Sequence, residues 1–223
     1  MPDFARIEKN LEEISGIVEE YHKCSENLAG ELIPLYNQIN PALYSQKLAE
    51  AIKISANAHL TQKRYTKEPF LVHPCRTAYI AATLTKTQST TYISLLHETL
   101  NGSQPAKSQW DIQNSFGRHT YMGIWGLSLL QKIPDENHKT YEIIEHFKEM
   151  YRINIMPAKI CDVIDNLYTI RQMPGKRGMS AKKRQQEYLM MARKYILPMC
   201  HEFDKKHNKK ITGYFTNLLK TNE

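Results

Sequence analysis

The sequence predicts an all-α protein that folds as one helical domain. Apolar residues recur three and four positions apart in several segments, which is the spacing of one face of an α-helix. Sustained alternation of apolar and polar residues is almost absent, and no Asn-Gly pair joins two β-branched runs, so strands and hairpins are not expected. The 223 residues are enough to bury one sizeable core.

The N-terminal part is expected to be a helical extension. Ile7, Leu11, Ile14 and Val18 follow one another at helical spacing and predict one apolar stripe. No internal repeat and no clear interdomain linker follow it. The predicted organisation is an N-terminal helical extension (1–40), a main helical domain (41–205) and a C-terminal helical tail (206–223).

The next helix is predicted to run from about Pro41 to about Gln62, because proline fits the first turn of a helix. The segment 65–69 follows as a polar loop that ends in proline. The apolar stripe of this helix comprises Leu48, Ala51, Ile52, Ser55, Ala56 and His59.

Proline and glycine divide the rest of the chain into shorter helices. Pro74 opens one helix, Asn101-Gly102 ends another, and Pro174-Gly175 ends a strongly apolar one. The predicted ranges are 74–84, 90–100, 108–116, 119–130, 137–150, 155–172 and 180–200, with a weaker helix after them.

The charge indicates an anionic partner. The chain has 30 Lys and Arg against 23 Asp and Glu, which gives a net charge of +7 and a pI of about 9.1. A nucleic acid or a phosphorylated small molecule would suit this charge. A solvated basic surface also explains it, and composition alone favours that interpretation. The basic segment 176–194 has the same alternatives: attraction of phosphates at the mouth of a site, contact with RNA, or the favoured solvated face.

Composition also bears on the compartment. No segment approaches the roughly 18 apolar residues that span a bilayer, so no membrane partner is expected. The N-terminus lacks the apolar core of a signal peptide. Widely spaced cysteines without a Cys-x-x-Cys motif favour free thiols and a cytoplasmic location. These cysteines are Cys24, Cys75, Cys161 and Cys200.

Histidines and acids next to apolar runs are the candidates for chemistry. His97 and Glu98 follow the apolar segment 93–96. A carboxylate beside such a run is costly unless it is paired or bound to a metal. His73 follows another apolar run and directly precedes the helix-opening Pro74.

A polar stripe is predicted on a later helix. Lys159, Asp162, Asn166 and Thr169 recur at intervals of 3, 4 and 3, beside an apolar face. Two imidazoles and two carboxylates from separate helices could converge on one divalent ion. Mixed nitrogen and oxygen ligands suit Mn, Fe, Zn or Mg, and Mn²⁺ is favoured for a hydrolytic site.

Each of these features also has a structural interpretation. An isolated histidine is more often a satisfied structural residue, and an isolated His-Glu pair is weak evidence. A stripe of Asp and Asn is usually a solvated face of a helix. Spacing alone therefore does not establish a metal site, and the order of the segments has to decide.

Several short motifs follow one another in a characteristic order. They are Ala58-His59, Gln62-Lys63-Arg64, Glu68-Pro69-Phe70, His73-Pro74, Leu95-Leu96-His97-Glu98, Phe116-Gly117 and the stripe Lys159, Asp162, Asn166 and Thr169. Their order resembles the HD superfamily of metal-dependent phosphohydrolases. It is most similar to the hydrolase domain of RelA/SpoT-type enzymes and their small single-domain relatives, the (p)ppGpp 3′-pyrophosphohydrolases. The resemblance covers about residues 45–200.

This resemblance implies an HD-domain helical bundle that binds a divalent metal ion. Mn²⁺ is the favoured ion. It also implies that Arg64 stacks on or clamps a purine, which suits the cation–π chemistry of a guanidinium. The implied metal ligands are His73, His97, Glu98 and Asp162. The implied contacts to the ribose and phosphates are Lys63, Lys159, Asn166 and Thr169.

Two departures from the family pattern bear on catalysis. Glu98 stands where the family has Asp, and Asn101-Gly102 stands where it has a catalytic Glu-Asp pair. Asn101 lies one helical turn after His97 and should face the ion, but its amide cannot take a proton from water. A general base contributes about 10²–10⁴ in rate. Glu98 and Asn101 are therefore the candidate catalytic residues, with Glu98 as the substitute base. Further departures, which concern the purine site, are Thr61, Lys67, Phe70 and Val163.

The leading expectation is a metal-dependent phosphohydrolase that acts on a nucleotide. Water would attack the phosphorus of a 3′-pyrophosphate and release pyrophosphate, with a rate or substrate altered by the departures. One alternative is a degenerate HD domain that binds a phosphorylated nucleotide, a protein or a nucleic acid without hydrolysis. The other is a nucleic-acid-binding helical domain, which rests on the net charge of +7 and is less favoured.

Overall fold

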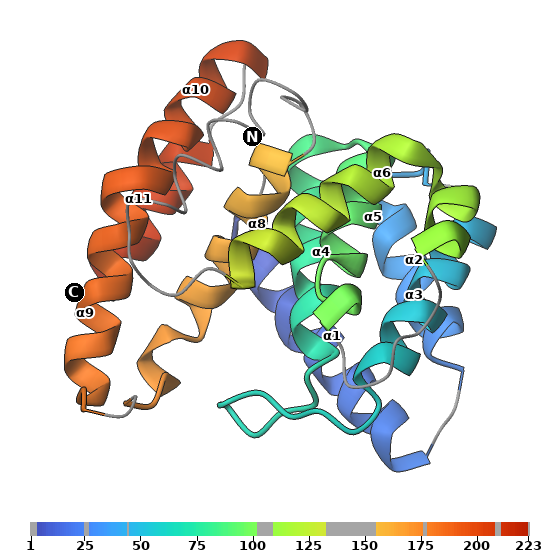
Figure 1. The fold of residues 1–223 in the computed structure, drawn as a ribbon, viewed down its shortest axis with the longest axis horizontal. Coiled ribbons are helices and arrows are strands. Elements are labelled where there is room, and N and C mark those ends of the chain that lie inside the picture. Colours follow the sequence, from blue (N-terminus) through green and yellow to red (C-terminus); the bar gives the residue numbers. More distant parts are fainter. Residues whose placement is uncertain are drawn as a thin grey trace.

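The structure, a computed structural model, is a bundle of helices, as the sequence predicts (Figure 1). Within the described ranges no strand forms, and an isolated β-bridge joins Lys63 to Pro69. No described helix is both long and apolar enough to cross a bilayer. The structure describes residues 4–24, 27–43, 45–101, 109–132, 155–175, 178–207 and 211–222.

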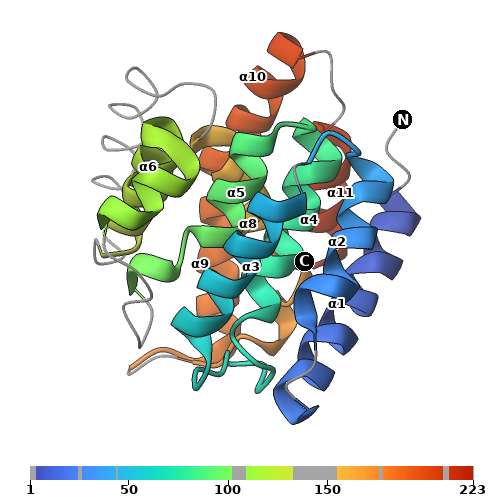
Figure 2. The same cartoon turned by 90° about the vertical axis from the view of Figure 1, so that its right-hand side faces the viewer.

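Three helices form the centre of the bundle: α4 (Val72–Thr85), α5 (Gln88–Leu96) and α8 (Ile155–Tyr168). They pack against one another and lie in the middle of both views (Figures 1 and 2). Almost every residue of α4 is buried, because small and apolar residues line all sides of this helix. A helix that is apolar all round belongs in the interior. Side chains that point inward from these helices are therefore held among packed neighbours.

The N-terminal helices join the same core. In α1 (Phe4–Cys24), the predicted stripe from Ile7 to Val18 is buried and packs against α4. The helix α2 (Leu28–Ile39) begins at Asn27, whose side chain accepts a hydrogen bond of 3.1 Å from the Gly30 backbone. It packs on α3 and α4. The predicted division after residue 40 stays a prediction, but these helices contribute to one continuous apolar core.

The first part of the main helical region ends in an ordered loop. The helix α3 (Ser45–His59) is shorter than predicted at both ends. The predicted loop follows and folds back on itself, with backbone hydrogen bonds from Arg64 to Glu68 (3.0 Å) and from Phe70 to Gln62 (2.9 Å). These bonds fix the approach of the chain to α4.

One predicted helix is divided, and the predicted break near Gly117 is present. The predicted helix 90–100 is α5 followed by a short 3₁₀ turn, η1 (Thr99–Asn101), and His97 caps the C-terminus of α5. The two predicted helices on either side of Gly117 both form. They are named together as α6 (Gln109–Lys132), and a kink with non-helical backbone at Gly117 separates them. Gly117 has φ 83° and ψ 161°, a conformation that glycine adopts without a Cβ clash. The predicted helix 137–150 lies outside the described residues.

The C-terminal helices pack on the far side of α8 (Figure 1). After α8 come η2 (Ile170–Gln172), α9 (Ala181–Met191), the π-helical turn η3 (Ala192–Ile196), α10 (Leu197–His207) and α11 (Ile211–Thr221). No residue of α9 is buried, and Lys182 and Lys183 are exposed, as expected of a solvated face. The predicted boundary after residue 205 falls inside α10, and the tail remains a predicted unit.

Candidate metal centre

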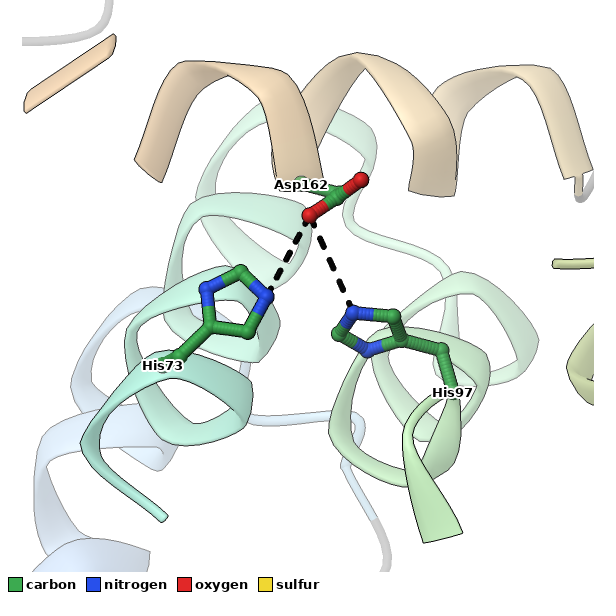
Figure 3. A group of neighbouring side chains, drawn as sticks. All are labelled: His73, His97 and Asp162. Carbon is green, nitrogen blue, oxygen red and sulfur yellow. Dashed lines mark ion pairs between the residues drawn. The ribbon is translucent and has the colours of Figure 1, made fainter. Parts of the chain in front are cut away.

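Three buried side chains from the three central helices meet at one point. They are His73 near the start of α4, His97 at the end of α5 and Asp162 on α8 (Figure 3). A ligand-type atom of each lies within 4.8 Å of the others. Both imidazoles direct Nε2 at the same oxygen, Asp162 Oδ1, at 3.2 Å from His73 and 3.8 Å from His97. The structure thus brings together three of the four predicted metal ligands.

The local sequence explains these positions. Pro74 in the first turn of α4 places His73 at the helix start, where the buried end of the loop meets the core. The buried residues before His97 hold the end of α5 against its neighbours. Asp162 lies between Cys161 and Val163, on a helix that is buried along most of its length. Apolar packing therefore carries each polar group into the interior.

The tautomer of His97 follows from its backbone contact. Its Nδ1 lies 2.7 Å from the Ser94 carbonyl oxygen, which can only accept, so Nδ1 carries the proton. Nε2 then presents a lone pair, and it is a buried atom without a hydrogen-bond partner. Burial lowers the pKa of His97 and outweighs the nearby carboxylates of Glu98 and Asp162, so the neutral ring is favoured.

His73 is oriented by a second acid. Its Nδ1 lies 2.7 Å from Oδ2 of Asp165, so Nδ1 donates to this carboxylate and Nε2 faces Asp162. Burial and Arg64 lower the pKa of His73, but the hydrogen bonds with Asp162 and Asp165 outweigh them and raise it. A proton on Nε2 would join the same two atoms that a cation would join, so protons and cations compete for this position.

Asp162 is held in the ionised form. Its Oδ2 accepts a hydrogen bond of 2.7 Å from Lys159 Nζ, and its Oδ1 accepts one of 2.8 Å from Asn166 Nδ2. Burial raises the pKa of Asp162, but Lys159 and the hydrogen bond with His73 outweigh burial and hold the pKa well below its ordinary value. Lys159 and Asn166, both predicted to contact substrate, thus lie in direct contact with the candidate metal ligand.

The donor set fits a divalent cation. Two imidazole nitrogens and a carboxylate oxygen face each other, and only a cation or a proton between them makes that arrangement favourable. Mixed nitrogen and oxygen donors are suited to Mn, Fe or Zn. The unpartnered Nε2 of His97 is the atom that such an ion would satisfy.

The remaining predicted ligand, Glu98, lies beside the three converging residues. Oε1 of Glu98 is 3.6 Å from His97 Nε2, and its side chain is 16% exposed. Among the described residues, Glu98 is outside the group whose ligand atoms lie within 4.8 Å of one another. The backbone of Asn101 ends η1, and its side chain lies outside the described part of the structure. The roles of Glu98 and Asn101 stay predictions.

The predicted purine contact has a different setting. The Arg64 side chain is only 4% exposed, and its guanidinium donates to Asp165 (3.1 Å), Glu68 (3.2 Å) and Asn166 (2.9 Å). This environment is a buried charge cluster and differs from an open surface on which a base could stack.

The other predicted substrate contacts are divided between interior and surface. Thr169 is buried, and its Oγ1 lies 2.7 Å from the hydroxyl of Tyr65. Lys63 is exposed on the loop. Of the residues predicted to contact the ribose and phosphates, Lys63 is therefore the one that reaches solvent most freely.

Sequence reasoning missed two residues of this region. Asp165 has no predicted role, although it is fully buried and contacts His73. Arg76 donates to Asp165 through Nε at 2.7 Å and has no predicted role either. A signal was present, since an acid on the apolar face of one helix and an arginine inside another apolar helix need partners.

A third histidine lies beside the centre. His59 ends α3, stacks on Phe70 at 4.7 Å between ring centroids, and has its Nδ1 at 2.7 Å from Gln62 Oε1. Its Nε2 is buried without a hydrogen-bond partner. Burial lowers the pKa of His59. The Ala58-His59 motif stands out in the sequence, and the structure places it on the loop side of the candidate centre.

Comparison with known proteins gives relatives but no family model, since none matches the chain. The bifunctional (p)ppGpp synthase/hydrolase SpoT of Escherichia coli (strain K12) is 28% identical over 153 residues, which are 66% of this chain and 21% of SpoT. The guanosine-3′,5′-bis(diphosphate) 3′-pyrophosphohydrolase of Aquifex aeolicus is 27% identical over 153 residues, 67% of this chain and 21% of that protein.

A plant protein shows the same similarity. The putative GTP diphosphokinase RSH1, chloroplastic, of Oryza sativa subsp. japonica is 26% identical over 164 residues, 69% of this chain and 18% of that protein. The chain spans about a fifth of the length of the curated relatives it matches. The similarity therefore concerns one part of much longer proteins of the RelA/SpoT type.

Proposed function

We propose that this protein is a metal-dependent phosphohydrolase that acts on a phosphorylated nucleotide, of the (p)ppGpp 3′-pyrophosphate type. The observation that carries the proposal is the convergence of two buried imidazole nitrogens on one carboxylate oxygen. The names of several relatives, such as guanosine-3′,5′-bis(diphosphate) 3′-pyrophosphohydrolase, support this substrate class. Because the chain matches only a fifth of those proteins, synthase activity is not carried over.

The cation would be held by His73, His97 and Asp162, with Glu98 as the proposed fourth ligand. Mn²⁺ is the proposed ion. A divalent cation bound there supplies polarisation of a phosphoryl group and a lowered pKa of water. The protein contributes the buried position and the fixed donors, since the side chains of all three residues are at most 6% exposed.

Cationic and polar residues beside the centre suit a phosphorylated ligand. Lys159 lies 2.7 Å from Asp162, and its side chain is 19% exposed. It thus carries positive charge between the buried centre and solvent, where a phosphate would approach. Lys63 on the loop is the proposed second cation, and Asn166 and Thr169 are proposed contacts of the ribose.

Glu98 is the proposed proton acceptor. The chain lacks the Glu-Asp pair of the resembled family, and the Glu98 carboxylate is the acid next to the imidazole of His97. Water would attack the phosphorus on the 3′ oxygen, its proton would pass to Glu98, and the bond from that phosphorus to the 3′ oxygen would break. Pyrophosphate would leave, and the 3′ oxygen would take up a proton to become a hydroxyl group.

A substrate panel tests the proposal. The purified protein, loaded with Mn²⁺, is assayed against ppGpp, pppGpp, other (p)ppNpp nucleotides and NADPH for release of pyrophosphate or phosphate. We expect turnover of at least one, and loss of turnover in His97→Asn. Absence of turnover on the whole panel, with the metal shown to be bound, would contradict the proposal.

A second candidate function is binding of a phosphorylated nucleotide without hydrolysis. It is favoured by one specific observation, the replacement of the Glu-Asp pair by Asn101-Gly102. Calorimetry should then show nucleotide binding without product, and the double change Asn101→Glu, Gly102→Asp should produce hydrolysis. If the parent is already fast and the double change has no effect, this second function is excluded.

A further inference from the structure

A cluster of four charged side chains, three buried and one partly buried, adjoins the candidate centre. Asp165 on α8 is 0% exposed and is surrounded by donors. Its Oδ1 accepts from Arg76 Nε at 2.7 Å, and its Oδ2 accepts from His73 Nδ1 at 2.7 Å and from Arg64 at 3.1 Å. Glu68 joins the two arginines, at 3.2 Å from Arg64 and 3.1 Å from Arg76. Two positive and two negative side chains thus compensate one another, with His73 as the neighbour on the side of the centre.

We infer that Asp165 is a positioning residue that fixes His73 as a cation ligand. The inference rests on the proposed function and assigns a role to a residue outside the three-atom group. A carboxylate accepts but does not donate, so the contact of 2.7 Å keeps the proton on Nδ1 of His73. In the neutral ring, the lone pair of Nε2 then points to Asp162 Oδ1 at 3.2 Å. An outer carboxylate of this kind fixes the ring orientation and makes the imidazole a better ligand.

The two arginines, Arg64 and Arg76, allow Asp165 to stay ionised in the interior and to accept the hydrogen bond from His73. A lone carboxylate at 0% exposure would be too costly to remain ionised, whereas two guanidinium partners supply compensating charge and hydrogen bonds. They also bind both oxygens, so the carboxylate cannot rotate away from His73. Arg64 therefore contributes to the centre through Asp165, and its guanidinium is occupied by this contact.

No other described acceptor near Nδ1 has comparable geometry. Thr77 Oγ1 lies 3.5 Å from His73 Nδ1, a distance at which a hydrogen bond is weak. Without Asp165, the proton of His73 is free to move to Nε2, where Asp162 Oδ1 accepts it. That tautomer closes the position a cation would take. A purely structural anchor for the arginines would have no such effect on His73.

The test uses the full chain with Asp165→Asn and Asp165→Ala. An amide has one acceptor oxygen where the carboxylate has two, so in Asp165→Asn one of the donors meets an NH₂ group. Two properties are measured: the affinity for Mn²⁺ by calorimetry, and the tautomer of His73 from ¹⁵N shifts of the imidazole in a pH series without the ion. We expect a loss in affinity of about 10–100-fold and a shift of the proton to Nε2.

The matched control is Tyr79→Phe. Tyr79 lies on α4, as His73 does, and the change removes its buried hydrogen bond with Asn10 on α1. It should change neither the Mn²⁺ affinity nor the tautomer. Unchanged affinity and tautomer in a folded Asp165 variant would overturn the inference. If the Asp165 variants do not fold, the parent protein alone still tests the inference. A proton on Nε2 of neutral His73 in the parent would overturn the inference. If the parent takes up no Mn²⁺, the proposed function fails, and the tautomer series still tests whether Asp165 positions His73.

Discussion

At the residue scale, the main feature is that Nε2 of His73, Nε2 of His97 and Oδ1 of Asp162 face one another in the interior. Backbone and side-chain partners fix the protons of His97 and His73 on Nδ1, so both rings turn a lone pair toward the same oxygen of Asp162. In a dry interior such acceptors repel one another unless a positive charge lies between them. The arrangement therefore needs a positive charge at this point, which either a cation or a proton on Nε2 of His73 supplies.

Glu98 gives a residue-scale prediction on catalysis. If its carboxylate takes the proton of water, Glu98→Gln should lower kcat by about 10²–10⁴ because an amide cannot accept that proton. Glu98→Asp should retain more activity, since it keeps the charge. The measurement is the rate of pyrophosphate release with saturating Mn²⁺. Glu187→Gln, an exposed acid on α9, is the control and should behave as the parent. A Glu98→Gln protein as fast as the parent would exclude this role.

At the level of single residues, the sequence predicts which residues form the centre better than it predicts which partners these residues contact. His73, His97 and Asp162 each stand out because a polar group follows or interrupts an apolar run, and the structure brings them together. The contacts of Arg64 depend on how the loop folds against α8, about 100 positions later in the chain. Helical spacing places Asp165 beside Asp162 but does not tell which imidazole it reaches.

At the scale of single helices, α1 provides a prediction about the N-terminal extension. Leu11 is fully buried against the core, so Leu11→Ala should reduce the free energy of unfolding by about 2–5 kcal/mol. Glu13→Ala on the exposed face of the same helix should change it by less than about 0.5 kcal/mol. Chemical denaturation of both variants measures the difference. A Leu11→Ala protein as stable as Glu13→Ala would show that the extension is not part of the core.

The contact between α2 and α4 predicts a dependence on pH. Tyr36 is fully buried and donates to the Cys75 carbonyl at 2.7 Å, and burial raises its pKa well above the ordinary value of 10.0. As pH rises past about 10, Tyr36 loses its phenolic proton in the unfolded chain but keeps it in the folded chain. This difference favours unfolding. The free energy of unfolding should thus fall above about pH 10, and less steeply in Tyr36→Phe. Parallel slopes in urea titrations of the two proteins would contradict this.

Helix types are more predictable than helix ends. The stripe from Ile7 to Val18 has clear periodicity, and the structure confirms it. The sequence predicts two helices on either side of Gly117, and the structure has a helical segment on each side of the non-helical Gly117. The predicted helix 90–100 divides into α5 and η1, and His97 at the division faces Asp162 of α8 with Nε2 at 3.8 Å. Such contacts leave no local signal in the sequence.

At the scale of the whole molecule, the net charge is +7, and within the described part of the chain several lysines and arginines, such as Lys182, Lys183 and Arg193, are exposed. Screening limits the reach of such charges to about 8 Å at physiological ionic strength. The double change Lys182→Gln, Lys183→Gln should therefore leave kcat/KM within about twofold at that ionic strength. Lys159→Met should reduce kcat/KM strongly, because Lys159 contacts Asp162 directly. Equal effects of the two changes would show that the basic helix acts in the reaction.

The centre exists only in the folded chain. Its residues come from α4, the end of α5 and α8, and the first and last are about 90 positions apart. A cation that binds the folded state alone stabilises it, by about 2.7 kcal/mol at one hundred times the dissociation constant. Thermal unfolding of the whole protein should therefore shift upward with added Mn²⁺.

The most direct test of the central claim is the metal content of the protein. The parent and Asp162→Ala are loaded with Mn²⁺, freed of unbound metal by gel filtration and analysed by mass spectrometry for bound divalent ions. The proposed centre predicts an equimolar amount of Mn²⁺ in the parent and almost none in Asp162→Ala, which loses the oxygen on which both imidazoles converge. A parent without metal, or a variant that retains as much as the parent, would contradict the claim.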